Sequence, residues 1–271
     1  MRSIADQSVE EMGGSGSVLA RQKRDHVRLD GLLHRLAAVV PGEEAPVLLD
    51  IYRLVFPHAF AEETILWPVA RRLLPDGDAF TLRVEKEHQQ INELVTRLEA
   101  LAPGSFEHRQ VLDRVVELLR EDLRDEEDAL LPRLQAKLTP AKLRLLGLAW
   151  EAVRWIAPTR AHPIVARRPP GNVLSALPLA LLDRLRDLVD ARLHQRPVLL
   201  AGTLRQVRSA LARSSHSVEQ LPGMRSGEDP ATRVGRGGGR GWGTVAALAG
   251  VAAASAGLVL AARRRNLAAG G

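Results

Sequence analysis

Cysteine is absent from the 271-residue chain, which excludes disulfide bonds, thiolate metal ligands and a cysteine nucleophile. Any bound metal ion must therefore be held by imidazole and carboxylate groups. Aromatic residues make up only 3% of the sequence, and runs of the β-branched and aromatic residues that favour strands are scarce. Leu, Ala, Arg and Glu recur instead at helical spacing, so the sequence predicts an all-α protein.

A secretory signal is also lacking at the N-terminus. Residues 1–17 are polar and contain Gly and Ser, whereas a signal needs a basic stretch followed by an apolar run. We expect residues 1–17 to be disordered and the domain that follows them to stay in the cytoplasm.

Charge of each sign is concentrated in one half of the chain. Residues 1–140 contain 18 Lys and Arg against 25 Asp and Glu, a net charge of −7. Residues 141–271 contain 20 against 7, a net charge of +13. The two halves are therefore expected to face different partners.

Four helical segments are predicted in the acidic half, separated by turn sequences that contain Pro and Gly. They cover roughly residues 18–40, 46–74, 79–101 and 106–138. Short connections make consecutive helices antiparallel neighbours. Residues 18–138 are therefore predicted to form an up-down-up-down four-helix bundle.

This bundle consists of two copies of one helical hairpin. Residues 25–32 match residues 87–94 at an offset of 62 positions, and residues 58–68 match residues 122–132 at an offset of 64. Both copies carry an acidic residue before the His and a Glu-Glu-x-x-Leu-x-Pro segment. The repeat predicts an approximate two-fold axis between the hairpins.

Six polar side chains fall on the apolar stripes of these helices, where hydrophobic residues recur every three or four positions. They are His26, His58, Glu62, His88, Asp122 and Glu126. An unpaired carboxylate in a protein core costs several kcal/mol, so a cation is the expected partner. A His or Asp four residues before a Glu places both side chains on one face. Two such pairs and two further histidines can surround two metal ions, with the glutamates bridging.

The order of these residues resembles that of a known family. A His is followed by His-x-x-x-Glu-Glu-x-x-Leu-x-Pro at residues 58–68 and by Glu-His at residues 87–88. This pattern resembles the hemerythrin/HHE cation-binding domain over roughly residues 20–138. In that family inward His and Glu residues bind a di-iron centre that interacts with dioxygen, and bacterial relatives have been linked to oxygen, nitric oxide or peroxide responses and to iron handling. The resemblance implies His26, His58, Glu62, His88 and Glu126 as ligands.

Two positions depart from the family pattern. Asp122 stands where the family usually has His, and Val84 leaves no second His one turn before His88. Three imidazoles and three carboxylates make a harder, more anionic site, which favours ferric iron and also admits manganese. We therefore expect redox or peroxide chemistry in preference to reversible oxygen carriage. Glu85, three residues before His88, is a lesser candidate ligand.

Two functional interpretations stay open at this point. The first is a membrane-tethered di-iron protein that interacts with dioxygen, nitric oxide or peroxide for sensing or detoxification, with a peroxidase- or catalase-like reaction as its enzymatic form. The second is a metal-free bundle that serves as an interaction module at the membrane. The remaining histidines have no such partners and are predicted to lie at the surface or in loops: His34, His108, His162, His194 and His216.

The basic half is predicted to carry further helices and a membrane span. We expect amphipathic, Arg-rich helices within residues 139–221 and a flexible Gly- and Arg-rich linker at residues 222–241. Residues 242–262 form an uncharged run of 21 residues, which is long enough to cross a bilayer, and a basic tail follows at residues 263–271. An Ala- and Gly-rich low-complexity tail is the alternative.

The partner expected for this basic half is an anionic membrane surface, with the protein crossing the membrane once near its C-terminus. Nucleic-acid binding is not expected, because no recognised motif is present. Aromatic residues that could stack on bases are also nearly absent after Trp155.

Overall fold

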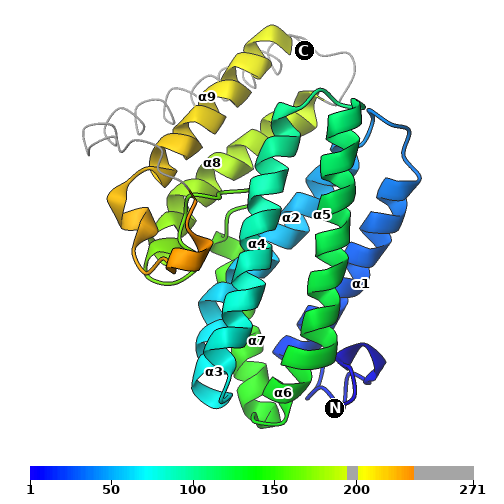
Figure 1. The fold of residues 1–271 in the computed structure, drawn as a ribbon, viewed down its shortest axis with the longest axis vertical. Helices are drawn as coiled ribbons and strands as arrows, with labels where there is room; N and C mark the ends of the chain where they lie inside the picture. Colours follow the sequence, from blue (N-terminus) through cyan, green and yellow to red (C-terminus); the bar gives the residue numbers. More distant parts are fainter. Residues whose placement is uncertain (194–200, 235–271) are drawn as a thin grey trace, which may run out of the picture.

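The computed structural model describes residues 1–193 and 201–234, and every regular element within these ranges is helical (Figure 1). Four long helices form the bundle: α1 (Val18–Ala37), α2 (Ala45–Ala61), α4 (Gly77–Ala100) and α5 (Phe106–Asp125). Consecutive helices run in opposite directions along the long axis of the molecule. The all-helical bundle agrees with that part of the sequence prediction.

Side-chain caps define where several helices begin. Ser17 accepts a hydrogen bond from the backbone N–H of Leu19 at the start of α1, and Ser105 accepts one from His108 at the start of α5. Each cap satisfies a backbone donor that has no partner within the helix. The starts predicted at residues 18 and 106 coincide with these caps.

Each hairpin contains a wide π-helical turn at its Glu-Glu pair. The turn η2 (Glu62–Leu66) joins α2 to α3 (Trp67–Leu73), and η3 (Glu126–Leu130) joins α5 to α6 (Leu131–Gln135). In both turns a backbone N–H reaches back five residues to the carbonyl of the first Glu. The next residue is a proline, which has no N–H to continue the α-helical ladder.

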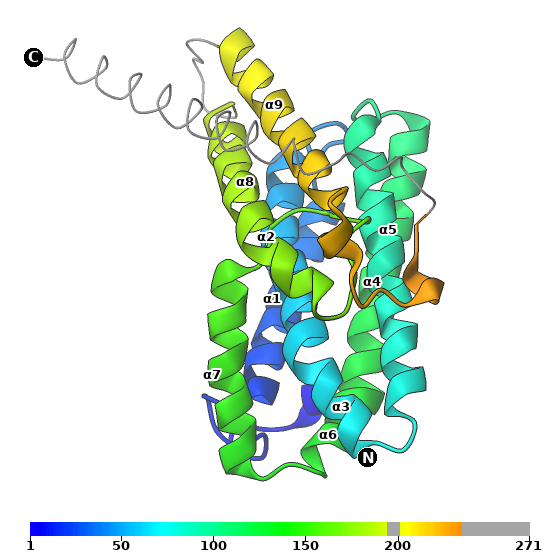
Figure 2. The same cartoon turned by 90° about the vertical axis from the view of Figure 1, so that its left-hand side faces the viewer.

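In the part of the chain that the structure describes, three further α-helices lie outside the four-helix bundle (Figure 2). The first, α7 (Pro140–Ile156), packs against α1 and α2. Their close approach requires Gly147, because a Cβ there would collide with the carbonyl oxygen of Gly16. The other two, α8 (Gly171–Leu193) and α9 (Ala201–Glu219), pack against each other and lie along one flank of the bundle.

A buried ionic network fastens α8 to the bundle. Arg160, in the segment between α7 and α8, is 5% exposed and makes ion pairs with Asp187 at 2.6 Å, Asp190 at 2.7 Å and Glu99 at 3.2 Å. The first two carboxylates belong to α8 and Glu99 belongs to α4. A guanidinium can satisfy several carboxylates at once, so one side chain joins the two parts.

His162 belongs to this network, although the sequence predicted a surface or loop position. Its Nδ1 lies 2.9 Å from Glu219 and its Nε2 lies 3.0 Å from Asp183, and all three side chains are buried. His108, predicted to lie at the surface, is also buried, with 5% exposure. Sequence neighbours could not reveal either position, because the residues that cover them are distant in the chain.

The bundle core is divided into two apolar clusters at opposite ends. The first cluster contains buried residues from the second half of α1, the first half of α2, the second half of α4 and the first half of α5. The second cluster lies at the other end and includes Trp67, Val84, Leu130 and Trp150. The polar residues singled out in the sequence lie between these clusters.

The segments expected to be disordered or flexible have defined contacts where the structure describes them. Ile4 and Met12 are buried in the second apolar cluster. Beyond α9, the short helices η4 (Pro222–Arg225) and η5 (Pro230–Thr232) follow, and the carbonyl of Met224 accepts a hydrogen bond from Ala166. A few buried apolar side chains and backbone hydrogen bonds thus connect these two polar, Gly-containing segments to the rest of the structure.

The predicted membrane span requires a correction. Residues 242–262 lie outside the described residues, and within residues 1–193 and 201–234 no helix is long and apolar enough to cross a membrane. The fold class is therefore corrected to all-α with no membrane-spanning helix among the described residues, and the same finding contradicts the predicted membrane localisation. The run owes its uncharged character largely to Ala and Gly, and these residues contribute little apolar surface.

Candidate metal centre

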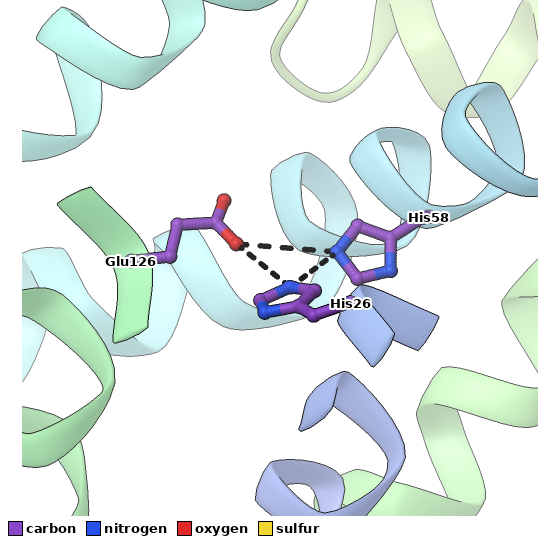
Figure 3. A group of neighbouring side chains, drawn as sticks. All are labelled: His26, His58 and Glu126. Atoms are coloured by element: carbon purple, nitrogen blue, oxygen red, sulfur yellow. Dashed lines mark hydrogen bonds and ion pairs between the residues drawn. The ribbon is translucent and has the colours of Figure 1, made fainter. Parts of the chain in front are cut away.

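The structure brings all six predicted residues together midway along the bundle. His26 Nε2 lies 3.3 Å from His58 Nε2 and 3.3 Å from Glu126 Oε2 (Figure 3). Three further contacts extend this group: His58 Nε2 to Glu62 Oε1 at 3.2 Å, His88 Nε2 to Glu62 Oε2 at 3.6 Å, and His88 Nε2 to Asp122 Oδ1 at 3.6 Å. The side chains come from α1, η2, η3 and the three remaining bundle helices.

The geometry separates into two candidate metal-binding groups. His26, His58 and Glu126 place one ligand atom each within 4.8 Å of one another, and Glu62, His88 and Glu126 do the same. Glu126 belongs to both groups. The two sets of ligand atoms are therefore adjacent.

Several buried atoms of this cluster have no hydrogen-bond partner among the described residues. They are Glu62 Oε2, His88 Nε2, Asp122 Oδ1 and Glu126 Oε1. Buried polar atoms are almost always satisfied, so four orphans at one place need an explanation. All four are oxygen or nitrogen atoms that can donate a lone pair to a cation, and the donor set therefore fits a metal centre.

An outer layer of carboxylates orients the three imidazoles. His26 Nδ1 lies 2.9 Å from Glu127, and His88 Nδ1 lies 3.0 Å from Glu63. His58 Nδ1 makes the corresponding contact with Asp25 at 3.1 Å. A proton on Nδ1 leaves Nε2 free to coordinate, and the carboxylate raises the basicity of the ring.

Sequence reasoning missed this outer layer. Asp25, Glu63 and Glu127 are each adjacent in sequence to a predicted ligand, and each belongs to a repeated motif. The signal that could have revealed these three carboxylates is that each lies in a segment that occurs twice in the chain. Gln22 was missed as well; it donates a hydrogen bond of 2.8 Å to Glu62 Oε1 from within the core.

In the metal-free protein, protons take the place of cations. Burial lowers the pKa of each imidazole, but the surrounding carboxylates outweigh it and raise the pKa of His26 to about 9. The pKa values of His58 and His88 are likewise raised well above the ordinary value by contacts with the carboxylates around them. Positive charge is therefore stabilised at this place in the bundle.

The two central glutamates respond in opposite directions. Burial and the nearby charges of Glu62 and Asp122 raise the pKa of Glu126 to about 7. Burial opposes ionisation of Glu62 too, but the charges of His58 and His88 lower its pKa to about 2. Two facing carboxylates in a core cannot both be ionised without nearby positive charge, which a bridging cation would supply.

The second hairpin has a more acidic version of the same arrangement. Asp122 occupies the place of His58 in the repeat, and Glu87 occupies the place of Asp25. Burial and the charges of Asp122 and Asp125 raise the pKa of Glu87 to about 7. This half of the centre thus concentrates carboxylates where the first half has an imidazole.

Two other positions from the sequence analysis lie away from the centre. Glu85, the lesser candidate ligand, is buried and forms ion pairs with Arg71 and with Arg168, the latter at 2.8 Å. It belongs to neither metal-binding group. Val84 is fully buried in the second apolar cluster.

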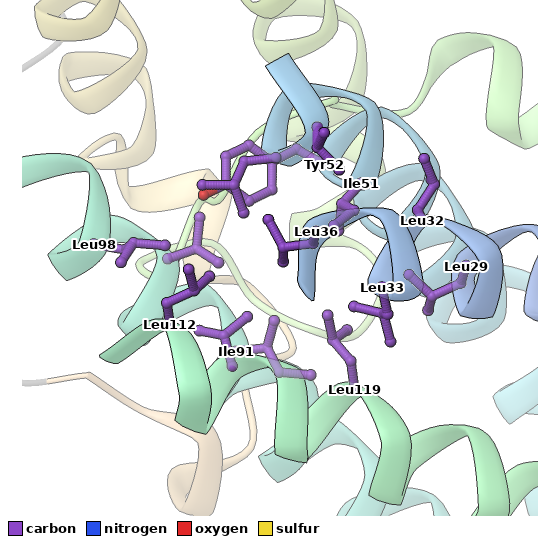
Figure 4. Packing of buried hydrophobic residues seen from close by; sticks show 14 of the residues in the cluster. Leu29, Leu32, Leu33, Leu36, Ile51, Tyr52, Ile91, Leu98, Leu112 and Leu119 are labelled. Carbon is purple, nitrogen blue, oxygen red and sulfur yellow. The ribbon is translucent and has the colours of Figure 1, made fainter. Parts of the chain in front are cut away.

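The surroundings of the centre are apolar on both sides. The first apolar cluster, which includes Leu29, Ile91 and Leu119, closes one end (Figure 4). On the other side the ring of Trp150, on α7, meets the ring of His58 edge-on with centroids 5.1 Å apart. A low-dielectric environment of this kind strengthens electrostatic interactions among the ligands.

Comparison with known proteins places the centre in a family. Residues 17–134 match the model of the hemerythrin HHE cation binding domain. An uncharacterized hemerythrin-like protein of Schizosaccharomyces pombe is 24% identical over 134 residues, which cover 49% of this chain and 66% of the relative. A DNA nickase of Nostoc sp. is 26% identical over 105 residues, which cover 39% of this chain and 29% of the relative.

The chain thus spans just under two thirds of the first relative and less than a third of the second. No solved structure matches the chain. The family match covers the four bundle helices and every residue of the His and carboxylate cluster. Residues 17–134 are therefore a hemerythrin HHE cation-binding domain whose His and Glu groups could bind a metal.

Proposed function

We propose that the bundle holds a non-haem di-iron centre that interacts with dioxygen, nitric oxide or peroxide in sensing or detoxification. The observation that carries this proposal is the pair of metal-binding groups that share Glu126. A single shared carboxylate between two sets of ligands favours two ions over one.

Each proposed ligand has a role in this arrangement. His26 and His58 would hold one ion, His88 and Asp122 would hold the other, and Glu62 and Glu126, which lie between these residues, would complete the ligand sets. Three carboxylates among six ligands stabilise the higher charge of ferric iron, and they also suit manganese. When bound, iron supplies one-electron chemistry and a coordination position for a small oxygen-containing or nitrogen-containing molecule.

Burial of the centre supports a small ligand. The side chains of His26, His88, Glu62 and Glu126 are at most 3% exposed, and those of His58 and Asp122 are 12% and 13% exposed. A diatomic molecule or hydrogen peroxide fits such a site, whereas a bulky substrate has no access to it. The apolar walls exclude bulk water, which protects reactive oxygen chemistry from side reactions.

The name of the Nostoc relative suggests a second activity, cleavage of DNA. Phosphodiester cleavage by metal ions needs both ions in contact with the phosphate. The proposed ligands of this chain are buried, so a DNA phosphate could not reach metal ions held by them. We therefore favour a small ligand and treat nicking of supercoiled plasmid as a result that would overturn this choice.

Elemental analysis of the full-length protein tests the di-iron proposal. After anaerobic reconstitution with ferrous iron, we expect about two irons per chain, as in other di-iron helical bundles. The Glu62→Ala, Glu126→Ala double variant should lose them. A matched Glu117→Ala, Glu121→Ala double variant, which alters two exposed carboxylates on α5, should retain them.

The metal-free interaction module is the competing outcome. It predicts no stoichiometric iron, manganese or zinc and an unfolding midpoint that does not change with a chelator, because a ligand that is not bound cannot contribute to stability. Peroxide consumption by the iron-loaded protein, lost in Glu62→Ala, would indicate an enzyme. Reversible spectral changes with dioxygen or nitric oxide and no turnover would indicate a sensor.

A further inference from the structure

Two arginines from outside the HHE domain contact the outer layer of the centre. Nη1 of Arg154, on α7, lies 2.9 Å from Oδ2 of Asp25. Nη1 of Arg167, between α7 and α8, lies 3.9 Å from Oε1 of Glu63. Asp25 and Glu63 are the carboxylates that contact His58 and His88. For two of the three imidazoles, an arginine from the segment that follows the domain thus contacts the carboxylate that contacts the ring.

Both ion pairs are largely shielded from water, the Arg154–Asp25 pair at hydrogen-bonding distance and the Arg167–Glu63 pair at a longer distance. The side chains of Arg154 and Asp25 are 20% and 13% exposed, and those of Arg167 and Glu63 are 10% and 2% exposed. Charges held away from water interact more strongly than the same pair at the surface.

Other contacts restrict the position of each guanidinium. Arg167 donates from Nη2 to the backbone carbonyls of His162 at 2.6 Å and Val165 at 3.2 Å. The guanidinium of Arg154 lies 6.0 Å from the centroid of the Trp150 ring, which is nearly perpendicular to the ring of His58. Neither arginine is a freely moving surface side chain, so each can fix the carboxylate beside it.

We propose that Arg154 and Arg167 are positioning residues of the metal centre, which keep Asp25 and Glu63 directed at Nδ1 of His58 and His88. A fixed carboxylate holds the ring proton on Nδ1, and Nε2 then faces the proposed ions. The segment after residue 134 therefore completes the centre. This inference rests on the proposed di-iron function, but its first test does not.

The third imidazole provides an internal reference. His26 contacts Glu127, and within the described part of the chain no arginine contacts the Glu127 side chain. Substitution of Arg154 should therefore affect His58, and substitution of Arg167 should affect His88. His26 should remain unchanged in Arg167→Met, and in Arg154→Met it should change less than His58, from which it lies 3.3 Å away.

The test compares Arg154→Met and Arg167→Met with the matching Lys variants in the full-length protein. Met keeps an apolar stem and removes the charge, whereas Lys restores the charge without the planar fork. Arg184→Met is the matched control. Arg184 donates to the carbonyls of Trp155, Ala157 and Ala180 and, within the described residues, does not contact the centre.

The first readout is the set of histidine ring ¹⁵N shifts in the metal-free protein. We expect the shifts of His58 to change in Arg154→Met and those of His88 in Arg167→Met, with recovery in the Lys variants and no change in Arg184→Met. Unchanged rings in both Met variants, or equal changes in the control, would overturn the inference. Should Arg167→Met fail to fold, Arg154→Met decides the result.

The second readout is the affinity for Mn²⁺ alone, measured by competition with a chelator. Loss of an outer-shell partner typically weakens metal binding by about 10–100-fold, and we expect a loss at the lower end of this range for each Met variant. Lys variants that bind as weakly as the Met variants would contradict a role of charge. Absence of metal from the unaltered protein would remove the proposed function, and the ring shifts would still decide the positioning role.

Discussion

Nδ1 of His26 lies 2.9 Å from the carboxylate of Glu127, and these two residues belong to opposite hairpins of the repeat. The reciprocal contact joins His88, on the second hairpin, to Glu63, on the first, at 3.0 Å. Each hairpin thus supplies the carboxylate that orients a histidine of the other. Neither hairpin contains a complete centre, so metal binding should depend on correct pairing of the two repeats.

Equivalent substitutions in the two hairpins should have similar effects. Glu63→Gln and Glu127→Gln each remove the negative charge that orients one imidazole, and we expect each to weaken Mn²⁺ binding by about 10–100-fold. Chelator competition measures this directly, with Glu121→Gln, at an exposed position of α5, as the control. An unchanged Mn²⁺ affinity in Glu127→Gln would show that the two halves of the centre are not equivalent.

The sequence was sufficient to predict the four bundle helices and the six inward side chains. Apolar residues at helical spacing set the buried face of each helix, and a polar residue on that face, such as His88, is conspicuous. The duplicated hairpin added the pairing of His58-Glu62 with Asp122-Glu126. These features are local or repeated, and for that reason one sequence reveals them.

Other parts of the fold depend on contacts between distant residues. The π-helical turns place both Glu62 and Glu63 in the core, whereas a regular helix pattern assigns only one of them an inward position. Arg160 and His162 lie in a Pro-rich segment that resembles a loop in sequence. Their carboxylate partners are 21 to 61 residues away, so no pattern in the chain reveals their burial.

Replacement of Asp122 by His should shift the iron centre toward the ferrous state. Asp122→His removes one negative charge and gives the second hairpin the imidazole that the first hairpin has at His58. One unit charge at about 5 Å in a medium of dielectric about 20 corresponds to a rise in reduction potential on the order of 100 mV. Spectroelectrochemical titration of the iron-loaded protein measures the shift.

The control for that substitution is Asp113→His, one of the exposed positions of α5. This substitution changes the net charge of the protein by the same amount, but Asp113 lies nine residues before Asp122 on the same helix. An unchanged potential in Asp122→His, or an equal rise in Asp113→His, would remove Asp122 from the ligand set.

Metal uptake should release protons. The carboxylates hold protons on the imidazoles of the metal-free protein, with the pKa of His26 raised to about 9, and a metal ion must displace them. Affinity for Mn²⁺ is therefore expected to increase as the pH rises from 6 toward about 9. Calorimetry at pH 7 in two buffers of different ionisation enthalpy counts the released protons, and identical heats in both buffers would contradict the prediction.

The same shift makes the metal-free fold sensitive to alkali. Because the pKa of His26 is raised from 6.5 to about 9, its contribution to stability is complete below about pH 6.5 and is lost as the pH rises through about 9. Urea unfolding of the metal-free protein between pH 6 and pH 9.5 should show this loss. Bound metal replaces the protons, so the metal-loaded protein should show a smaller dependence.

The attachment of α8 and α9 to the bundle should depend on His162. This imidazole lies between Asp183 and Glu219, which, against the effect of burial, raise its pKa to about 10. His162→Gln removes the central charge of a buried ionic group and should lower the free energy of unfolding by about 3–5 kcal/mol. His216→Gln, at an exposed position of α9, is the control and should be close to neutral.

The pH dependence of this effect separates charge from packing. The contribution of protonated His162 is complete below about pH 6.5 and disappears as the pH rises through about 10, so the unaltered protein and His162→Gln should converge in stability at high pH. An equal difference at pH 7 and pH 10.5 would assign the loss to packing. The iron content of folded His162→Gln should stay that of the unaltered protein, because His162 contacts neither the ligands nor their outer carboxylates; a loss of iron would instead show that the α8–α9 pair supports the centre.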